Sequence, residues 1–234
     1  MEIITTGDGW LFLFRWMHFL AGVAWIGMLW YFNFVQTPFF GTELGGGVKG
    51  AMTRGLVPNA LWWFRWGAMF TFLTGITIIL MMWGMRGMAL SSPYMTKILT
   101  GGLMGILMWA NVWFVIWPAQ KVVIANAEQV AGGGKPIPEA AARGARAGTA
   151  SRINTLFSIP MLFFMGSASH LPHLALDINT MVYWVIALIV ILGVEAHALI
   201  GPGLATQKPL TSVSGTIHAG LGLTVVLYVV ASIV

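Results

Sequence analysis

Five histidines and two arginines inside or at the ends of long apolar segments are the residues of this chain best suited to redox or metal chemistry. Arg15 and His18 lie three residues apart in the first apolar segment, so a helix places them on one side, about one turn apart. Ionisable groups at membrane depth are costly and indicate function when a partner can be named. A b-type haem is such a partner, because its iron binds imidazole and its propionates bind guanidinium. Gly22, one turn beyond His18, would let the flat macrocycle lie close to the backbone; the alternative is a packed interhelical histidine beside an arginine that reaches the membrane surface.

The composition indicates that these residues lie in a membrane protein. Of the 234 residues, 58% are hydrophobic and only 8% are charged, and the mean hydropathy is +0.82. A water-soluble core of this size could not bury so much apolar surface. The absence of cysteine excludes disulfides, thiolate metal sites and c-type haem attachment within this sequence. The formal charge of +5 comes from basic residues scattered through short loops, which favours a topology signal and no nucleic-acid partner.

The apolar segments predict an all-α fold, a polytopic transmembrane helix bundle in one membrane domain, residues 1–234. Six crossings are expected, at about residues 10–36, 59–84, 98–117, 150–169, 179–200 and 211–234. A glycine-rich loop is expected at 41–50, and the longest polar stretch, 119–149, is expected to be a loop with a short surface helix at 139–147. The first segment lacks the pattern of a cleaved signal peptide, so we expect it to be retained.

The distribution of lysine and arginine predicts the orientation of the bundle. Eight basic residues follow crossings one, three and five, against two on the opposite side and two inside crossings. The eight are Lys49, Arg54, Lys121, Lys135, Arg143, Arg146, Arg152 and Lys208; the two opposite are Arg86 and Lys97, and the two inside are Arg15 and Arg65. Because loops rich in basic residues stay in the cytoplasm, loop 119–149 is expected there, both termini in the periplasm, and the protein in the bacterial inner membrane.

This topology divides the histidines into an outer and an inner group. His18 and His170 fall near the outer face and His197 and His218 near the inner face, each pair from two different crossings. Such a layout is typical of membrane cytochromes with bis-imidazole haem b, and it predicts one or two haems. Glycines four residues from these histidines support the prediction: Gly22, Gly166, Gly193, Gly201 and Gly222. The alternative explanation is that small residues favour close helix packing.

The remaining polar residues have more than one interpretation. His173 follows Pro172 and is a weaker outer ligand than His170, although a copper site from both histidines and nearby Met165 is an alternative. Glu195 lies two residues before His197, so the two side chains point about 200° apart on a helix. It could serve a proton path or pair with Arg65, the second cation inside a crossing. Three asparagines are expected to form interhelical hydrogen bonds: Asn33, Asn111 and Asn154.

Three segments resemble the membrane domain of bacterial membrane-bound urate hydroxylase, the urate oxidase N-terminal family. They are Trp16–Gly27, Trp117-Pro118-Ala119-Gln120, and Ala150–Met165 with the following His170. The resemblance implies oxidation of urate at the inner membrane, with electrons leaving through a C-terminal cytochrome c domain in the periplasm. The sequence departs from that pattern because it contains no Cys-x-x-Cys-His motif and ends at Val234.

Three functions are therefore consistent with the sequence. The first is a haem-b redox subunit that passes electrons to a periplasmic c-type cytochrome or to a larger electron-transfer complex. The second is an oxidoreductase of the urate hydroxylase type. The third is a cofactor-free scaffold subunit of a respiratory or photosynthetic membrane complex. A reduced-minus-oxidised absorption spectrum separates the third from the others, and urate-dependent haem reduction separates the second from the first.

Overall fold

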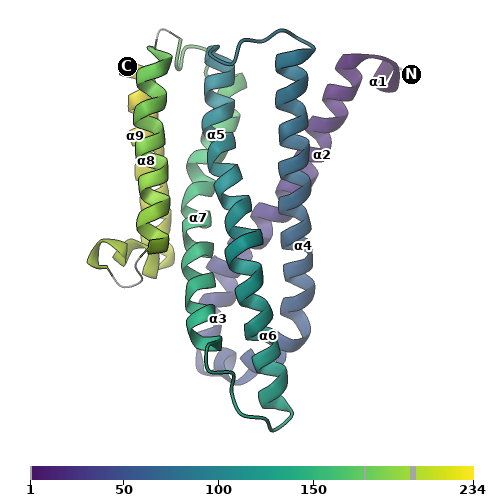
Figure 1. Ribbon diagram of the computed structural model, residues 1–234, viewed down its shortest axis with the longest axis vertical. Helices are drawn as coiled ribbons and strands as arrows, with labels where there is room; N and C mark the ends of the chain where they lie inside the picture. The colour runs from purple at the N-terminus through teal and green to yellow at the C-terminus, as the bar shows by residue number, and fades with distance from the viewer. Residues whose placement is uncertain (1, 177, 201–203) are drawn as a thin grey trace.

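The computed structural model describes residues 2–176, 178–200 and 204–234, and every regular element among them is helical, which confirms the predicted all-α fold (Figure 1). Along the chain these elements are α1 (Glu2–Thr5), α2 (Gly7–Trp30), η1 (Tyr31–Gln36), α3 (Thr37–Phe40), α4 (Glu43–Gly84), α5 (Pro93–Ala110), η2 (Asn111–Ile116), α6 (Trp117–Ala131), α7 (Ala140–His170), α8 (Thr180–Ile200), η3 (Ala205–Thr211) and α9 (Val213–Ile233). The α2–α3 and α5–α6 runs are each continuous, so the described residues form six long helical runs that pack side by side.

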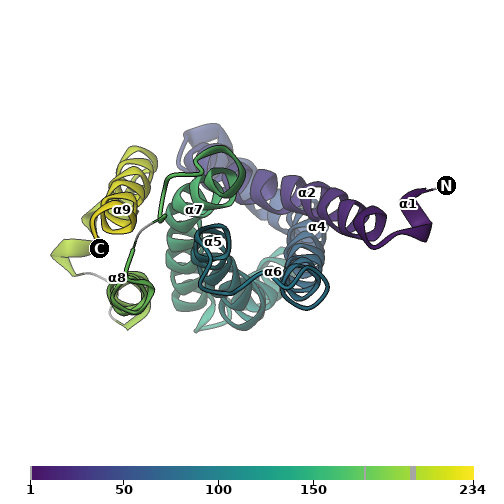
Figure 2. The same cartoon turned by 90° about the horizontal axis from the view of Figure 1, so that it is seen from above.

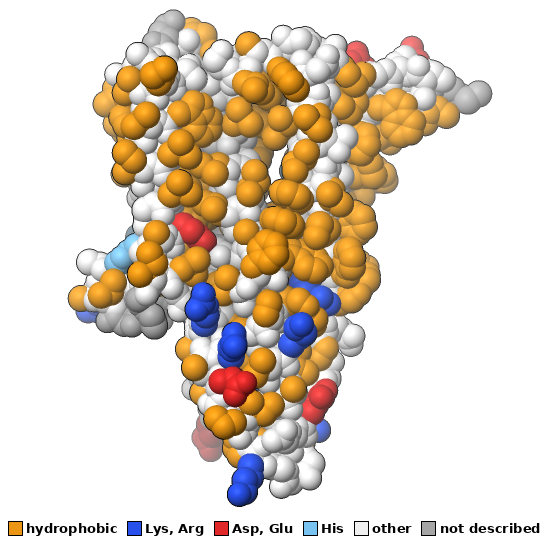
Figure 3. Space-filling view, in the orientation of Figure 1, with side chains coloured by type: hydrophobic (Ala, Val, Ile, Leu, Met, Phe, Trp, Pro, Cys, Tyr) orange, Lys and Arg blue, Asp and Glu red, His pale blue; other side chains and the backbone are white. Residues whose placement is uncertain are grey.

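Five of these runs are long and apolar enough to cross a membrane, which indicates a multi-pass membrane protein. Within the described residues they are Gly7–Phe40, Glu43–Gly84, Pro93–Ala131, Thr180–Ile200 and Val213–Ile233. Their apolar side chains face outwards rather than inwards: no more than 33% of the most apolar window of any of them is buried inside the bundle. Apolar side chains cover much of the visible surface, and most of the visible charged side chains lie in its lower half (Figure 3). An apolar surface of this extent is expected to contact lipid.

The sixth run, α7, is less apolar because it carries exposed arginines in its first turns and buried polar side chains in its middle turns. It lies between the α5–α6 run and the α8–α9 pair, as the view from above shows (Figure 2). Six consecutive residues of its middle turns, 153–158, are all buried. Two of them, Asn154 and Ser158, are polar and have hydrogen-bond partners on other helices. Such buried polar residues lower the mean hydropathy of a helix even though they do not contact lipid.

The longest helices exceed the thickness of a bilayer. At 1.5 Å per residue, the 42 residues of α4 span roughly 63 Å, whereas a hydrocarbon core is about 30 Å thick. The excess lies at the lower end in Figure 1, where α4 begins with the glycine-rich stretch that the sequence led us to expect as a loop. That expectation is wrong: the Thr42 side chain caps the helix by accepting from the Gly45 N–H at 3.1 Å. A Cβ on Gly45 would lie 1.8 Å from the Phe39 carbonyl oxygen, so this tight α3–α4 corner requires glycine.

Two prolines widen a helix instead of ending it. Pro38 and Pro118 each stand two residues beyond a six-residue π-helix, η1 and η2. A proline lacks an N–H and crowds the preceding turn, so the backbone before it changes to bonds between residues five apart. The Thr37 N–H bonds Phe32 O and the Trp117 N–H bonds Val112 O. Both helices then continue, which corrects the expected ends at residues 36 and 117 and shortens the loop expected at 119–149 to residues 132–139.

Glycines set the closest helix contacts. A Cβ on Gly67 of α4 would lie 3.0 Å from the Trp25 backbone nitrogen of α2, and a Cβ on Gly220 of α9 would lie 2.8 Å from the Leu156 oxygen of α7. These contacts join α2 to α4 and α9 to α7 at nearly backbone distance, a packing mode that small residues favour in membranes. A core of buried side chains links all the long helices around them.

Candidate functional site

A large open cavity, the loop-side cavity, lies at the end of the bundle that carries the loop between α6 and α7. Its volume is about 1700 Å³, and it is bounded by η1, the first turns of α4, α6, the start of α7 and η3. Its lining includes the glycine-rich first turns of α4, the polar part of α6 and the α7 residues that follow the loop at 132–139. A water-soluble molecule could therefore enter it from that side.

Four basic side chains line this cavity without a compensating acid. They are Lys49, Arg54, Arg152 and Lys208, and the described lining residues include no aspartate or glutamate. The bonds of the two arginines go to backbone oxygens: Arg54 Nε lies 3.4 Å from Gly50 O, and Arg152 Nη1 lies 3.3 Å from Leu210 O. Among the described residues the single ion pair, Arg86 with Asp8, is at the other end of the molecule. An anion is the class of ligand that such an uncompensated set of cations attracts.

The inner end of the cavity combines aromatic rings with amides. Phe32 and Phe64 meet edge to face, with ring centroids 5.7 Å apart. Beside them Asn33 donates to Ser151 Oγ at 2.7 Å, which joins η1 to α7. Gln36 is 8% exposed, and its Oε1 atom is buried without a partner. A buried unpartnered acceptor costs free energy, and an N–H donor on a bound ligand would relieve that cost.

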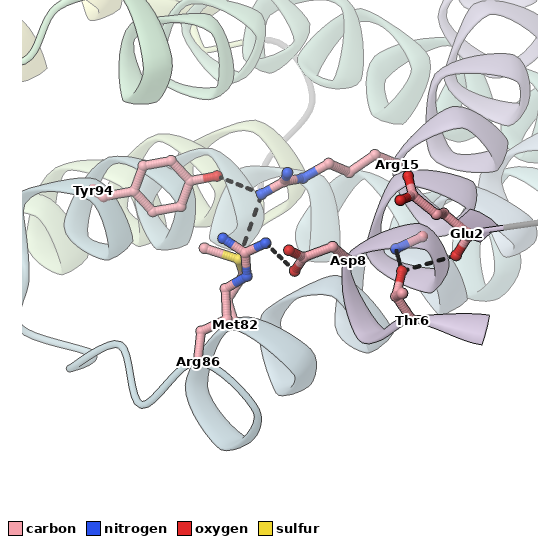
Figure 4. A network of polar contacts seen from close by, with 8 residues as sticks. Glu2, Thr6, Asp8, Arg15, Met82, Arg86 and Tyr94 are labelled. Atoms are coloured by element: carbon pink, nitrogen blue, oxygen red, sulfur yellow. Dashed lines mark hydrogen bonds and ion pairs between the residues drawn. The ribbon is translucent and has the colours of Figure 1, made fainter. Parts of the chain in front are cut away.

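The outer cation, Arg15, contacts neutral groups. Its Nη2 atom lies 3.4 Å from both Tyr94 Oη and Met82 Sδ, while neighbouring Asp8 pairs with Arg86 (Figure 4). Arg15 therefore has no acidic partner among the described residues, and the propionate contact expected from the sequence stays a prediction.

The outer histidines lie on helices that diverge. The Nδ1 atom of His18 is 3.1 Å from Thr74 Oγ1 of α4, so its ring turns towards α4. His170 is exposed at the last residue of α7, and His173 is exposed in the turn that follows. Helices α2 and α7 meet where Trp30 Nε1 donates to Ser158 Oγ at 2.9 Å, and α2 then leans away towards the N-terminus (Figure 1). The geometry does not bring His18 and His170 together.

The inner histidines have different surroundings. His197 of α8 is half-buried, and its Nε2 atom has no partner among the described residues. His218 of α9 is exposed, and its Nδ1 atom lies 2.7 Å from Ser214 O of its own helix. The described residues contain no group of three or more histidine, cysteine or acidic side chains that could hold a metal ion. The haem and copper assignments therefore stay predictions.

The second intramembrane cation, Arg65, is stacked on an aromatic ring. Its guanidinium carbon lies 3.4 Å from the centroid of the Trp117 ring and 5.8 Å from that of Trp113. The pairing of Arg65 with Glu195 that the sequence left open is not formed, because Glu195 hydrogen-bonds Asn111 instead. A delocalised cation over an indole is stabilised without an acid, which explains how Arg65 is accommodated at this depth.

The asparagines behave as predicted. Asn33 bonds Ser151, and Asn111 Nδ2 donates to Asn154 Oδ1 at 2.9 Å, so η1 and η2 both hydrogen-bond α7. The role of Gln36 in the cavity was missed. Its only sequence signal is a glutamine two residues before a proline in an apolar segment, which does not reveal that the side chain is buried at the end of a cavity.

Comparison with protein families gives one match. The family model described as urate oxidase N-terminal matches residues 88–230, which is more than half of the chain. The matched part runs from the turn before α5 into α9, and it contains two of the three resembling segments but not Trp16–Gly27. No curated protein and no solved structure matches the chain in the same comparisons.

Proposed function

Because this chain belongs to the urate oxidase N-terminal family, we propose that it is a urate hydroxylase-like membrane protein whose loop-side cavity binds urate. The observation that carries the proposal is the uncompensated basic lining around a floor of aromatic rings and amides. Urate at neutral pH is a planar monoanion with several N–H donors, so it matches all three features. The arginines would hold its charge, the phenylalanines Phe32 and Phe64 would contact its ring, and Gln36 Oε1 would accept one of its N–H groups.

The chemistry of urate hydroxylation requires an electron acceptor. A hydroxyl group from water is added at the purine C5, and two electrons and two protons leave, which gives 5-hydroxyisourate. We propose that the electrons pass to a periplasmic c-type cytochrome or to a larger electron-transfer complex. In this proposal the chain's own residues bind the anion and orient its ring at the inner end of the cavity.

Urate binding tests this proposal directly. Equilibrium dialysis of the purified protein in detergent should show retention of urate but weaker retention of the neutral purine hypoxanthine. Arg54→Gln should weaken urate binding by about tenfold to a hundredfold, because a charge-assisted hydrogen bond contributes roughly 1.5–3 kcal/mol. Gln36→Leu should weaken it by a smaller factor.

Matched controls separate local effects from general ones. Arg143→Gln removes the same charge from an exposed position at the same end of the molecule but outside the cavity lining. Gln129→Leu is the corresponding control for Gln36→Leu, because Gln129 is exposed and also lies outside the lining. Equal loss in Arg54→Gln and Arg143→Gln would contradict a specific site, and no urate retention at all would favour the scaffold function.

A second proposal, a b-type haem with His18 as an axial ligand, is supported by the glycines near the histidines. A Cβ added to any of the four described ones, Gly22, Gly166, Gly193 and Gly222, would meet nothing within 4 Å. Close helix packing therefore does not explain these glycines, and open faces beside histidines could receive a macrocycle. Gly201, the fifth, lies outside the described residues.

The Thr74 contact to His18 Nδ1 supports that residue as the ligand, since outer partners fix the rings of metal-ligating histidines. The expected second ligand, His170, is exposed at the last residue of α7 and has no contact with His18 among the described residues. A bound haem would carry electrons one at a time. A reduced-minus-oxidised spectrum of the purified protein should show haem b bands, and a featureless spectrum would exclude this proposal.

The finer topology is part of the same proposal. We propose that α7 is a sixth crossing, that both termini face the periplasm, and that the cavity opens to the cytoplasm of a bacterium, because eight of the ten loop cations lie on the cavity side. A protease site placed at Gly133, in the loop between α6 and α7, should be fully protected in right-side-out vesicles. Cleavage there would show that this loop faces the periplasm and would contradict the proposed orientation.

A further inference from the structure

A carboxyl group inside the bundle has no role in the proposed urate site. Glu195 lies on α8, five residues before that helix ends, and it is 9% exposed. Its Oε2 atom is buried without a hydrogen-bond partner, and no cation within the described residues forms an ion pair with it. An unpaired carboxylate at this depth in a membrane helix would be costly, whereas a carboxylic acid would not carry that charge.

One asparagine contacts this carboxyl group, and a second asparagine on another helix holds the first. The side chain of Asn111, the first residue of η2, hydrogen-bonds Glu195. The same Asn111 donates to Asn154 Oδ1 at 2.9 Å, and Asn154 Nδ2 donates to Met108 O at 2.9 Å. Asn111 is 3% exposed and Asn154 is fully buried. The three side chains thus form a continuous polar chain from α8 through η2 to α7 in an otherwise apolar core.

This polar chain leads towards the loop-side cavity. Ser151 and Arg152 of α7 line the cavity and stand within one helical turn of Asn154. The π-helix η2 carries Asn111 as its first residue. Such π-helices inside α-helices are frequent at functional sites. The buried carboxyl is therefore one end of a polar chain whose other end, Asn154, stands within one helical turn of the cavity lining.

We propose that Glu195 is an intramembrane proton-exchange site, which carries a proton at rest and exchanges it with water that reaches the Asn111–Asn154 pair from the loop-side cavity. The ligand of this site is a proton. The proposal does not depend on urate being the substrate, because any electron that enters a low-dielectric bundle is stabilised by a proton taken up nearby.

Chemical labelling tests whether the carboxyl is protonated in an apolar setting. Dicyclohexylcarbodiimide is an apolar reagent: the acid's O–H adds across one C=N bond, and the adduct rearranges to an N-acylurea, so the peptide gains the whole mass of the reagent and nothing leaves. Mass spectrometry of the labelled membrane protein should find this adduct on Glu195 but not on exposed Glu128, and Glu195→Gln should remove it. A folded protein without any adduct on Glu195 would overturn the proposal.

Infrared difference spectroscopy tests the exchange itself. The carboxylic-acid C=O band of the wild type should be absent from Glu195→Gln and should shift when the protein is moved into D₂O. Asn111→Leu should slow that shift at least threefold, whereas Thr100→Val, which removes a buried hydroxyl of α5 that does not line the cavity, should leave its rate unchanged. A band that does not shift, or that both variants slow equally, would contradict a path through Asn111.

Discussion

Replacing Asn154 by leucine should destabilise the bundle by an amount that its two hydrogen bonds predict. Asn154 accepts from Asn111 and donates to Met108 O, both at 2.9 Å, and it has no solvent exposure. Interhelical hydrogen bonds in membrane proteins contribute about 0.6 kcal/mol on average and up to about 1.7 kcal/mol each. Two lost bonds therefore give an expected decrease of roughly 1–3 kcal/mol in the free energy of unfolding, because leucine fills the volume but pairs with neither group.

A double-mutant cycle isolates the contact between the asparagines. Asn111→Leu also leaves Glu195 without its partner, but that cost is present in both the single and the double variant and cancels in the cycle. The double variant should be less destabilised than the sum of the two single variants by about 0.6–1.7 kcal/mol. The assay is unfolding of the detergent-solubilised protein in sodium dodecyl sulfate, followed by far-ultraviolet circular dichroism. Effects that add to within about 0.3 kcal/mol would refute the reasoning.

Three further variants test other parts of the structure. Gly67→Val should lower the free energy of unfolding by about 1–3 kcal/mol, because its side chain would press on the α2 backbone. Gly102→Val is the control in the same unfolding assay, because a Cβ at that position meets nothing within 4 Å. Lys97→Met should lower the melting temperature, because the buried Lys97 Nζ donates to Leu171 O at 2.7 Å. A hydrogen bond from a charged donor contributes roughly 1.5–3 kcal/mol, so an unchanged melting temperature would contradict that role. His18→Ala should abolish the haem b absorbance, and an unchanged haem-to-protein ratio would show that α2 carries no ligand.

The sequence predicts the class of fold well because lipid imposes a simple rule. Long apolar segments must be helical in a membrane, and five of the six expected crossings coincide with helices that are long and apolar enough. It also predicts that the asparagines bond between helices, since an amide in an apolar segment needs a partner. Its family resemblance is confirmed by the match over residues 88–230.

Local geometry could not be predicted in the same way. Pro38 and Pro118 stand just beyond the expected ends of the first and third crossings, yet each follows a π-helix and the helix continues. The glycine-rich stretch was interpreted as a loop, but tertiary packing and the Thr42 cap make it helical. The crossing angle between α2 and α7, which separates His18 from His170, depends on contacts such as that of Trp30 with Ser158 and has no periodic signature.

The two π-helices also rotate the side chains that follow them about the helix axis. An α-helix turns by about 100° per residue, so one additional residue in a turn rotates everything beyond it by about that angle relative to an unbroken helix. Asn111, at the start of η2, contacts α7, and Trp117, just after η2, stacks on Arg65 of α4. Both side chains reach their partners at once because η2 sets the rotation between them. Shortening the chain by a single residue between 111 and 116 would preserve hydrophobicity and helix length but turn one of these two side chains away from its partner.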